Sequence, residues 1–109
     1  MTTGELGFRV QVLLSIQRAL WDMVTPTLRG VAIQSRESPV RGRFLYEREP
    51  TLEEREIVAE VEAYVLADFD ESVGVAFQAD HVPRGMARDL APGEEWVYLR
   101  RETKNLVRE

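Results

Sequence analysis

A predicted β-hairpin over residues 28–47 limits the folds open to this chain more than any other feature of its sequence. Two runs of alternating side chains, residues 28–36 and 40–47, flank a turn at residues 37–38, and Pro39 stands at the mouth of the second run. Turn residues between two such runs are typical of antiparallel strands, and a proline is tolerated where a strand begins. The sequence therefore predicts one antiparallel pair of strands.

The position of the turn also predicts the register of this hairpin. Facing residues should have numbers that sum to about 75, which places Val31 opposite Phe44 and Arg29 opposite Tyr46. The other face receives mostly small or polar residues, namely Gly30, Ala32, Gln34 and Arg36 opposite Leu45, Arg43, Arg41 and Pro39. One register thus gives both strands an apolar face and a polar face, which supports the hairpin.

Helical patterns precede and follow the hairpin. Residues 6–24 place apolar side chains at the i, i+3, i+4 spacing of an amphipathic helix, and Pro26 disfavours helix at the residue before it. A second helix is predicted from Thr51, which forms a capping-box pattern with Glu54, to about Phe69. Each predicted helix has an apolar stripe that must be buried.

Two further strands are predicted at residues 73–81 and 95–101, separated by a polar segment at residues 82–94. The order α-β-β-α-β-β predicts a single α+β domain over residues 1–109, with a tail at residues 102–109 that frays or forms a short helix. We expect a two-layer sandwich, in which an antiparallel four-stranded sheet carries both helices on one face.

The absence of cysteine excludes a disulfide framework, a thiolate metal site and a cysteine nucleophile. The first residues lack the basic region of a signal peptide, and the apolar stretch at residues 10–14 is soon broken by polar residues. We therefore expect neither a signal peptide nor a membrane span, and we expect the protein to remain in the cytoplasm where it is made.

Negative charge is concentrated in the middle of the chain. Residues 47–71 contain ten acidic residues and two arginines, within a chain whose net charge is −5. An acidic chain is a poor candidate for general nucleic-acid binding, because phosphate contacts need a cationic surface. A basic protein partner suits it better.

No catalytic, cofactor or metal site is predicted. His81 is the only histidine, and Asp80 beside it would point to the opposite face of a strand, so the two would not form a general base with its orienting carboxylate. The acidic run at residues 68–71 lacks the turn glycine and the distal glutamate of a calcium loop. Neither a glycine-rich phosphate loop nor a nucleophile elbow occurs. These observations favour a binding protein over an enzyme.

Two predicted surfaces are candidates for binding a partner. Glu53, Glu56 and Glu60 line one side of the second helix, which suits docking to a cationic protein and equally suits an ordinary solvated helix face. The polar face of the sheet suits either a protein interface or a wet surface whose arginines pair with Asp80 or Gln78. The arginines of this face are Arg36, Arg41 and Arg43.

Four segments of the sequence resemble segments of a known protein family, and residues 96–98 show a weaker resemblance. They are TPTLRGV at residues 25–31, RFLY at 43–46, EPTLEE at 49–54 and EVEAYVLADF at 60–69. Together they resemble small bacterial immunity proteins of the contact-dependent growth-inhibition type, over roughly residues 20–70. The segments are mostly cap, strand and core residues, so the resemblance assigns no functional residue by position.

The resemblance implies a cytosolic protein that is made beside a toxin gene, needs no cofactor, and binds the toxin domain. Many such toxins are nucleases with cationic grooves, which an acidic helix would occupy in place of phosphate. Two other functions stay open. One is a homo-oligomeric structural or ligand-binding domain that pairs through the outer sheet face or the last strand, and the other is an enzyme whose site the substrate completes. The sequence leaves open whether the protein is a monomer or a homodimer.

Overall fold

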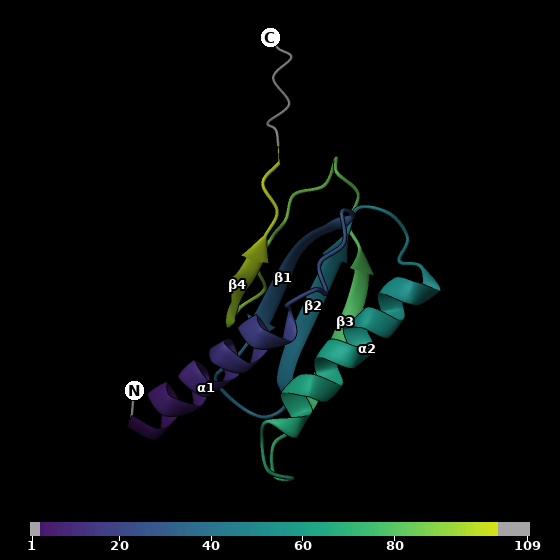
Figure 1. Cartoon of the computed structure of the whole chain (residues 1–109). Coiled ribbons are helices and arrows are strands. Elements are labelled where there is room, and N and C mark those ends of the chain that lie inside the picture. The colour runs from purple at the N-terminus through teal and green to yellow at the C-terminus, as the bar shows by residue number, and fades with distance from the viewer. Residues whose placement is uncertain (1–2, 103–109) are drawn as a thin grey trace.

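The computed structural model describes residues 3–102 and has the predicted order of elements (Figure 1). Its elements are α1 (Thr3–Ala19), β1 (Leu28–Gln34), β2 (Val40–Tyr46), α2 (Leu52–Ala67), β3 (Val75–His81) and β4 (Glu94–Leu99). Neither of the two helices within residues 3–102 has the length and apolar character that crossing a membrane requires. The tail predicted at residues 102–109 lies outside the described residues, apart from its first residue.

The strands form one mixed sheet in the order β3-β2-β1-β4. β1 is antiparallel to both of its neighbours, whereas β2 is parallel to β3. The prediction of a wholly antiparallel sheet is therefore wrong at this one pair. The reason is that α2 carries the chain from the end of β2 back to the end at which β2 began, so that β3 runs in the same direction. Both helices lie on one face of the sheet, as predicted (Figure 1).

The hairpin of β1 and β2 has the predicted register over most of its length. Val31 lies opposite Phe44, as expected. The pairing shifts at the start of β1, where Leu28 lies opposite Tyr46. The predicted pair of Arg29 with Tyr46 is wrong, because β1 has one extra residue at this point and its partner strand does not.

The start of α2 agrees with the prediction from the sequence, whereas the end of α1 does not. At the start of α2 the backbone N–H of Glu54 donates to the Thr51 hydroxyl at 3.1 Å, and the Glu54 carboxylate accepts from the backbone N–H of Thr51 at 2.9 Å. This is the predicted capping box. In contrast, α1 ends at Ala19, short of the predicted end near residue 24. Asp22 in the turn that follows has a φ of 66°, a left-handed conformation incompatible with continued helix.

The core lies between the two helices and the inner face of the sheet. Val12 of α1, Val61 of α2, and Val31 and Phe44 of the strands are all 0% exposed and belong to one cluster. The ring of Phe77 on β3 lies 6.0 Å from that of Phe44, which ties the edge strand to this cluster. Because α2 buries its apolar side here, its opposite side faces solvent.

The connection from β3 to β4 crosses the outer face of the sheet, since these two strands lie at opposite edges (Figure 1). The backbone carbonyl of Asp89 in this connection accepts a hydrogen bond from Arg43 at 2.9 Å. Ala32 and Leu45, which share the outer face with Arg43, are only 0% and 1% exposed. The sheet face that the sequence pattern left open is therefore partly covered by residues 82–93 of the same chain.

Candidate partner-binding site

An acidic row runs along the solvent side of α2. It consists of Glu53, Glu56 and Glu60, which are exposed and fall on one side of the helix by their spacing. Among the described residues, no ion pair engages any of these three carboxylates. The structure thus brings the three predicted residues together and gives them no opposite charge from within residues 3–102.

Neighbouring glutamates, in contrast, have structural partners. Glu54 is buried, and burial alone would raise the pKa of its carboxyl, but hydrogen bonds from Thr27 and Thr51 outweigh this and hold the pKa below its usual value. Glu49 forms an ion pair with Arg55 at 3.0 Å. The acidic row differs from these residues, because its carboxylates form no ion pair within residues 3–102, although Glu53 in the first turn of α2 suits the positive end of the helix.

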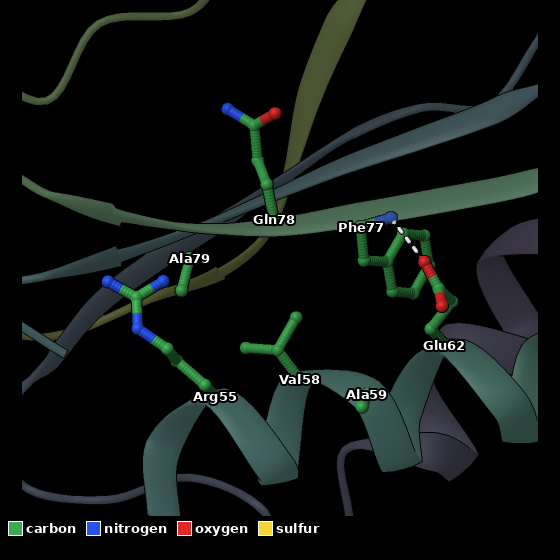
Figure 2. A pocket seen from close by; sticks show the side chains of 7 residues that line it. All are labelled: Arg55, Val58, Ala59, Glu62, Phe77, Gln78 and Ala79. Carbon is green, nitrogen blue, oxygen red and sulfur yellow. Dashed lines mark hydrogen bonds between the residues drawn. The ribbon is translucent and has the colours of Figure 1, made fainter. Parts of the chain in front are cut away.

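A groove of about 250 Å³ separates α2 from the edge strand β3 (Figure 2). Its lining residues are Arg55, Val58, Ala59, Glu62, Phe77, Gln78 and Ala79. Figure 2 shows Glu62 reaching from the helix to the strand, where its carboxylate accepts a hydrogen bond from the backbone N–H of Phe77 at 2.9 Å. Of the acidic row, Glu56 comes nearest to the groove, because it is one turn of helix from Ala59, whereas Glu53 and Glu60 lie farther round the helix.

The three arginines predicted for the outer sheet face fall into two groups. The Arg43 guanidinium donates to both carboxylate oxygens of Glu94, at 2.8 and 2.7 Å. It also lies 3.8 Å from the carboxylate of Asp80. Its hydrogen bonds to Glu94 raise the pKa of the Arg43 guanidinium and lower that of the Glu94 carboxyl. Arg36 and Arg41 are exposed. Arg43 is thus paired within the chain. This pairing agrees with the second interpretation of this face, a solvated sheet surface whose arginines bind acidic residues of the same chain.

The buried side chain of Arg29 on β1 binds the connection between β3 and β4 and so holds it against the sheet. Arg29 is 3% exposed and binds both carboxylate oxygens of Glu102, at 2.8 and 3.0 Å. Its Nη1 also donates toward the backbone carbonyls of Val82, Pro83 and Met86, at 2.9, 2.9 and 3.0 Å. The hydrogen bonds from Arg29 lower the pKa of Glu102 to about 2. The sequence gives no signal for this set of contacts, because it depends on the extra residue in β1.

Several large apolar side chains are exposed among the described residues, and Trp21 and Leu52 are the most exposed of them. Trp21 is 74% exposed and Leu52 is 76% exposed. Tryptophan is enriched among the residues that contribute most to protein interfaces, so Trp21 is a candidate contact residue. Trp96, predicted to pack at the core or an edge, does so, since its ring lies 2.9 Å from where a Cβ on Gly30 would stand.

The single histidine does not form an acid–base pair with its neighbour. The carboxylate of Asp80 accepts hydrogen bonds from Gln78 at 2.9 and 3.1 Å, whereas the His81 ring lies 3.7 Å from Glu49. The two side chains diverge, as the strand geometry predicted. Among residues 3–102, no group of three or more histidine or acidic side chains is arranged to hold a metal ion.

Comparison with known proteins shows that the chain is similar to a protein family. A family model described as MafI2 immunity protein matches residues 9–102. No curated protein matches the chain. The matched range includes the whole of α2 and β3, so the acidic row and the groove lie within it.

Proposed function

Because the chain belongs to the MafI2 immunity protein family, we propose that it neutralises its cognate toxin by direct binding through α2 and the adjoining edge of the sheet. The family is one of toxin-immunity proteins and not of enzymes. The surface that meets the toxin is therefore the functional site, and the proposal is that this surface is the acidic side of the molecule.

The observation that carries the proposal is the unpaired charge of the acidic row. A basic side chain of the toxin can approach Glu53, Glu56 or Glu60 without displacing an ion pair within residues 3–102. Arg43 on the outer sheet face would instead have to give up part of its pairing with Glu94. Charges that are complementary across an interface speed association and exclude wrong partners. These considerations favour α2 over the outer sheet face.

The proposed partner is a cationic toxin domain. A toxin that acts on nucleic acid needs a cationic groove for phosphate. Three carboxylates at helical spacing offer such a groove a set of negative charges in place of the substrate. Occupation of the groove by α2 would neutralise the toxin without any chemical change to it.

We further propose that the toxin belongs to a contact-dependent growth-inhibition system and that neutralisation takes place in the cytoplasm. The resemblance of residues 20–70 to immunity proteins of that type supports this choice. The test is a co-culture in which toxin-producing cells either touch target cells or are separated from them by a filter. Target cells should need this protein only when contact is allowed, and killing across the filter would contradict the contact-dependent part.

Purified protein mixed with the toxin domain encoded beside its gene is expected to form a one-to-one complex whose association slows as salt is added. The reason is that attraction between exposed charges is screened beyond about 10 Å at 0.1 M salt. Stopped-flow measurement of the association rate at increasing NaCl concentrations checks this. The dissociation rate should change less, because long-range attraction acts mainly on the approach. An association rate that does not depend on salt would reject the acidic row as the leading contact.

A further inference from the structure

The backbone hydrogen bonds of β3 define which of its polar groups are already used. The carbonyl of Gly74, just before the strand, accepts from the N–H of Val40 at 2.8 Å. The N–H of Val82, just after the strand, donates to the carbonyl of Tyr46 at 2.8 Å. Since the pattern alternates along a parallel pair, the even-numbered residues of β3 bond to β2, and the odd-numbered residues direct their N–H and C=O groups away from the sheet.

The outward groups of β3 have one partner within the described residues. The N–H of Phe77 donates to Glu62 at 2.9 Å, which agrees with its outward direction (Figure 2). The outward N–H groups that have no partner among residues 3–102 belong to Val75, Ala79 and His81. An edge strand with a row of unpaired groups is a template for another strand.

We propose that an extended segment of the toxin adds to the sheet along β3, with basic side chains directed toward α2. This inference rests on the proposed function and deepens it by naming the mode of contact. Strand addition obtains its affinity from main-chain hydrogen bonds and its specificity from the side chains beside the edge.

Charge determines which occupant suits this edge. Glu62 stands in the groove itself, Arg55 of the groove is paired with Glu49 at 3.0 Å, and Glu56 lies one turn of α2 from the groove residue Ala59. A second copy of this chain, with a net charge of −5, would bring like charges together along the edge. A basic segment would meet opposite charges at Glu62 and Glu56, so the toxin is the better occupant.

The small side chains of the groove leave room for such a segment. Val58 and Ala59 of α2 and Ala79 of β3 line its floor and walls (Figure 2). A strand beside β3 would place alternate side chains over these residues and the others toward solvent. Glu62 would then repel an acidic segment and attract a basic one, which gives the edge selectivity.

Ala79→Pro tests the proposal, because it removes an outward N–H and places the proline ring where the added strand must lie. The affinity for the toxin domain encoded beside the gene should fall about tenfold or more, while the ladder to β2 stays intact. Ala87→Pro is the matched control, since it introduces a proline at an exposed residue of the connection between β3 and β4, outside the groove. The control should bind within about threefold of the unsubstituted protein.

Amide exchange measured by NMR on the unsubstituted protein gives a second test that does not depend on how the proline variant folds. The N–H groups of Val75, Ala79 and His81 should exchange quickly in the free protein and slowly in the complex. Unchanged exchange at all three on toxin binding overturns strand addition. If association still depends on salt in that case, the proposed function stands and this inference alone fails. Protection that grows with the concentration of the free protein would identify a second copy as the occupant, which also overturns the inference.

Discussion

Replacing Arg29 with alanine is expected to lower the free energy of unfolding by about 3–5 kcal/mol, because it removes the most buried of the three arginines that pair with Glu102 and leaves buried polar groups without their donor. Arg29 is 3% exposed and the side chain of Glu102 is 14% exposed, so little solvent screens the pair. The substitution also removes the donor to three backbone carbonyls of the connection between β3 and β4. Urea unfolding followed by tryptophan fluorescence measures the change.

A double substitution serves as the control for this prediction. Arg29→Met combined with Glu102→Met removes both charges of the most buried pair, and part of the lost stability should return. Full return is not expected, because the three carbonyls still lack their donor. A loss below about 1 kcal/mol for Arg29→Ala would show that the buried pair contributes no more than a surface ion pair.

Acid should weaken the same pair in a defined window of pH. The folded-state pKa of Glu102 is lowered from 4.5 to about 2, so its ionised form stabilises the fold above pH 4.5, and this contribution is lost as the pH falls toward 2. The unsubstituted protein should therefore lose more stability between these values than the Glu102→Gln variant. Equal losses in the two proteins would contradict the assigned role of Glu102.

Reversing the charge of the acidic row is expected to slow association with the toxin domain by about 10–1000-fold, the range over which electrostatic steering acts. The variant carries lysine in place of Glu53, Glu56 and Glu60, all of which are exposed, so the fold should be retained. The salt dependence of association should also disappear or change sign. Stopped-flow fluorescence measures both effects.

A matched variant separates the position of the charges from their number. Lysine in place of Glu37, Glu71 and Asp89 changes the net charge by the same amount at three exposed residues outside α2. Association should slow far less in this control. Equal slowing in both variants would show that net charge matters and α2 does not, and no slowing in either would reject an electrostatic interface.

Much of the fold could be predicted from patterns among residues that are close in the sequence. The spacing of Thr51 and Glu54 predicts a helix start that depends only on residues within one turn. The alternation around the first turn predicts the pairing of Val31 with Phe44, because a shift of one residue would exchange the two faces. Both predictions are confirmed, since each depends on contacts between residues close in the sequence.

The neighbours of β3 could not be predicted in the same way. Alternation shows which side chains of a strand face the core, but not which strand lies beside it. The parallel pairing with β2 and the crossing of residues 82–93 over the outer face follow from the path of the whole chain. The sequence left two interpretations of the arginine face, a protein interface or a wet surface whose arginines pair with Asp80 or Gln78, because that path was unknown. For the same reason, the internal pairing of Arg43 with Glu94 could not be foreseen.

Only part of the candidate site could be predicted from the sequence. Helical spacing places Glu53, Glu56 and Glu60 on one side of a helix without any knowledge of the fold. Their lack of partners could not be read from the sequence, because the nearby Glu54 and Glu62 have the same chemistry and are engaged by Thr51 and Phe77. The groove beside them exists only because β3 is an edge strand.

Zero-length cross-linking of the complex tests most directly whether the acidic side of the molecule is the toxin-binding surface. A carbodiimide joins carboxylates to lysine side chains of the toxin that lie in contact with them, and mass spectrometry identifies the joined residues. The account predicts cross-links from Glu53, Glu56 or Glu60. Cross-links confined to carboxylates away from α2 and β3, such as Glu37 and Asp89, would contradict it.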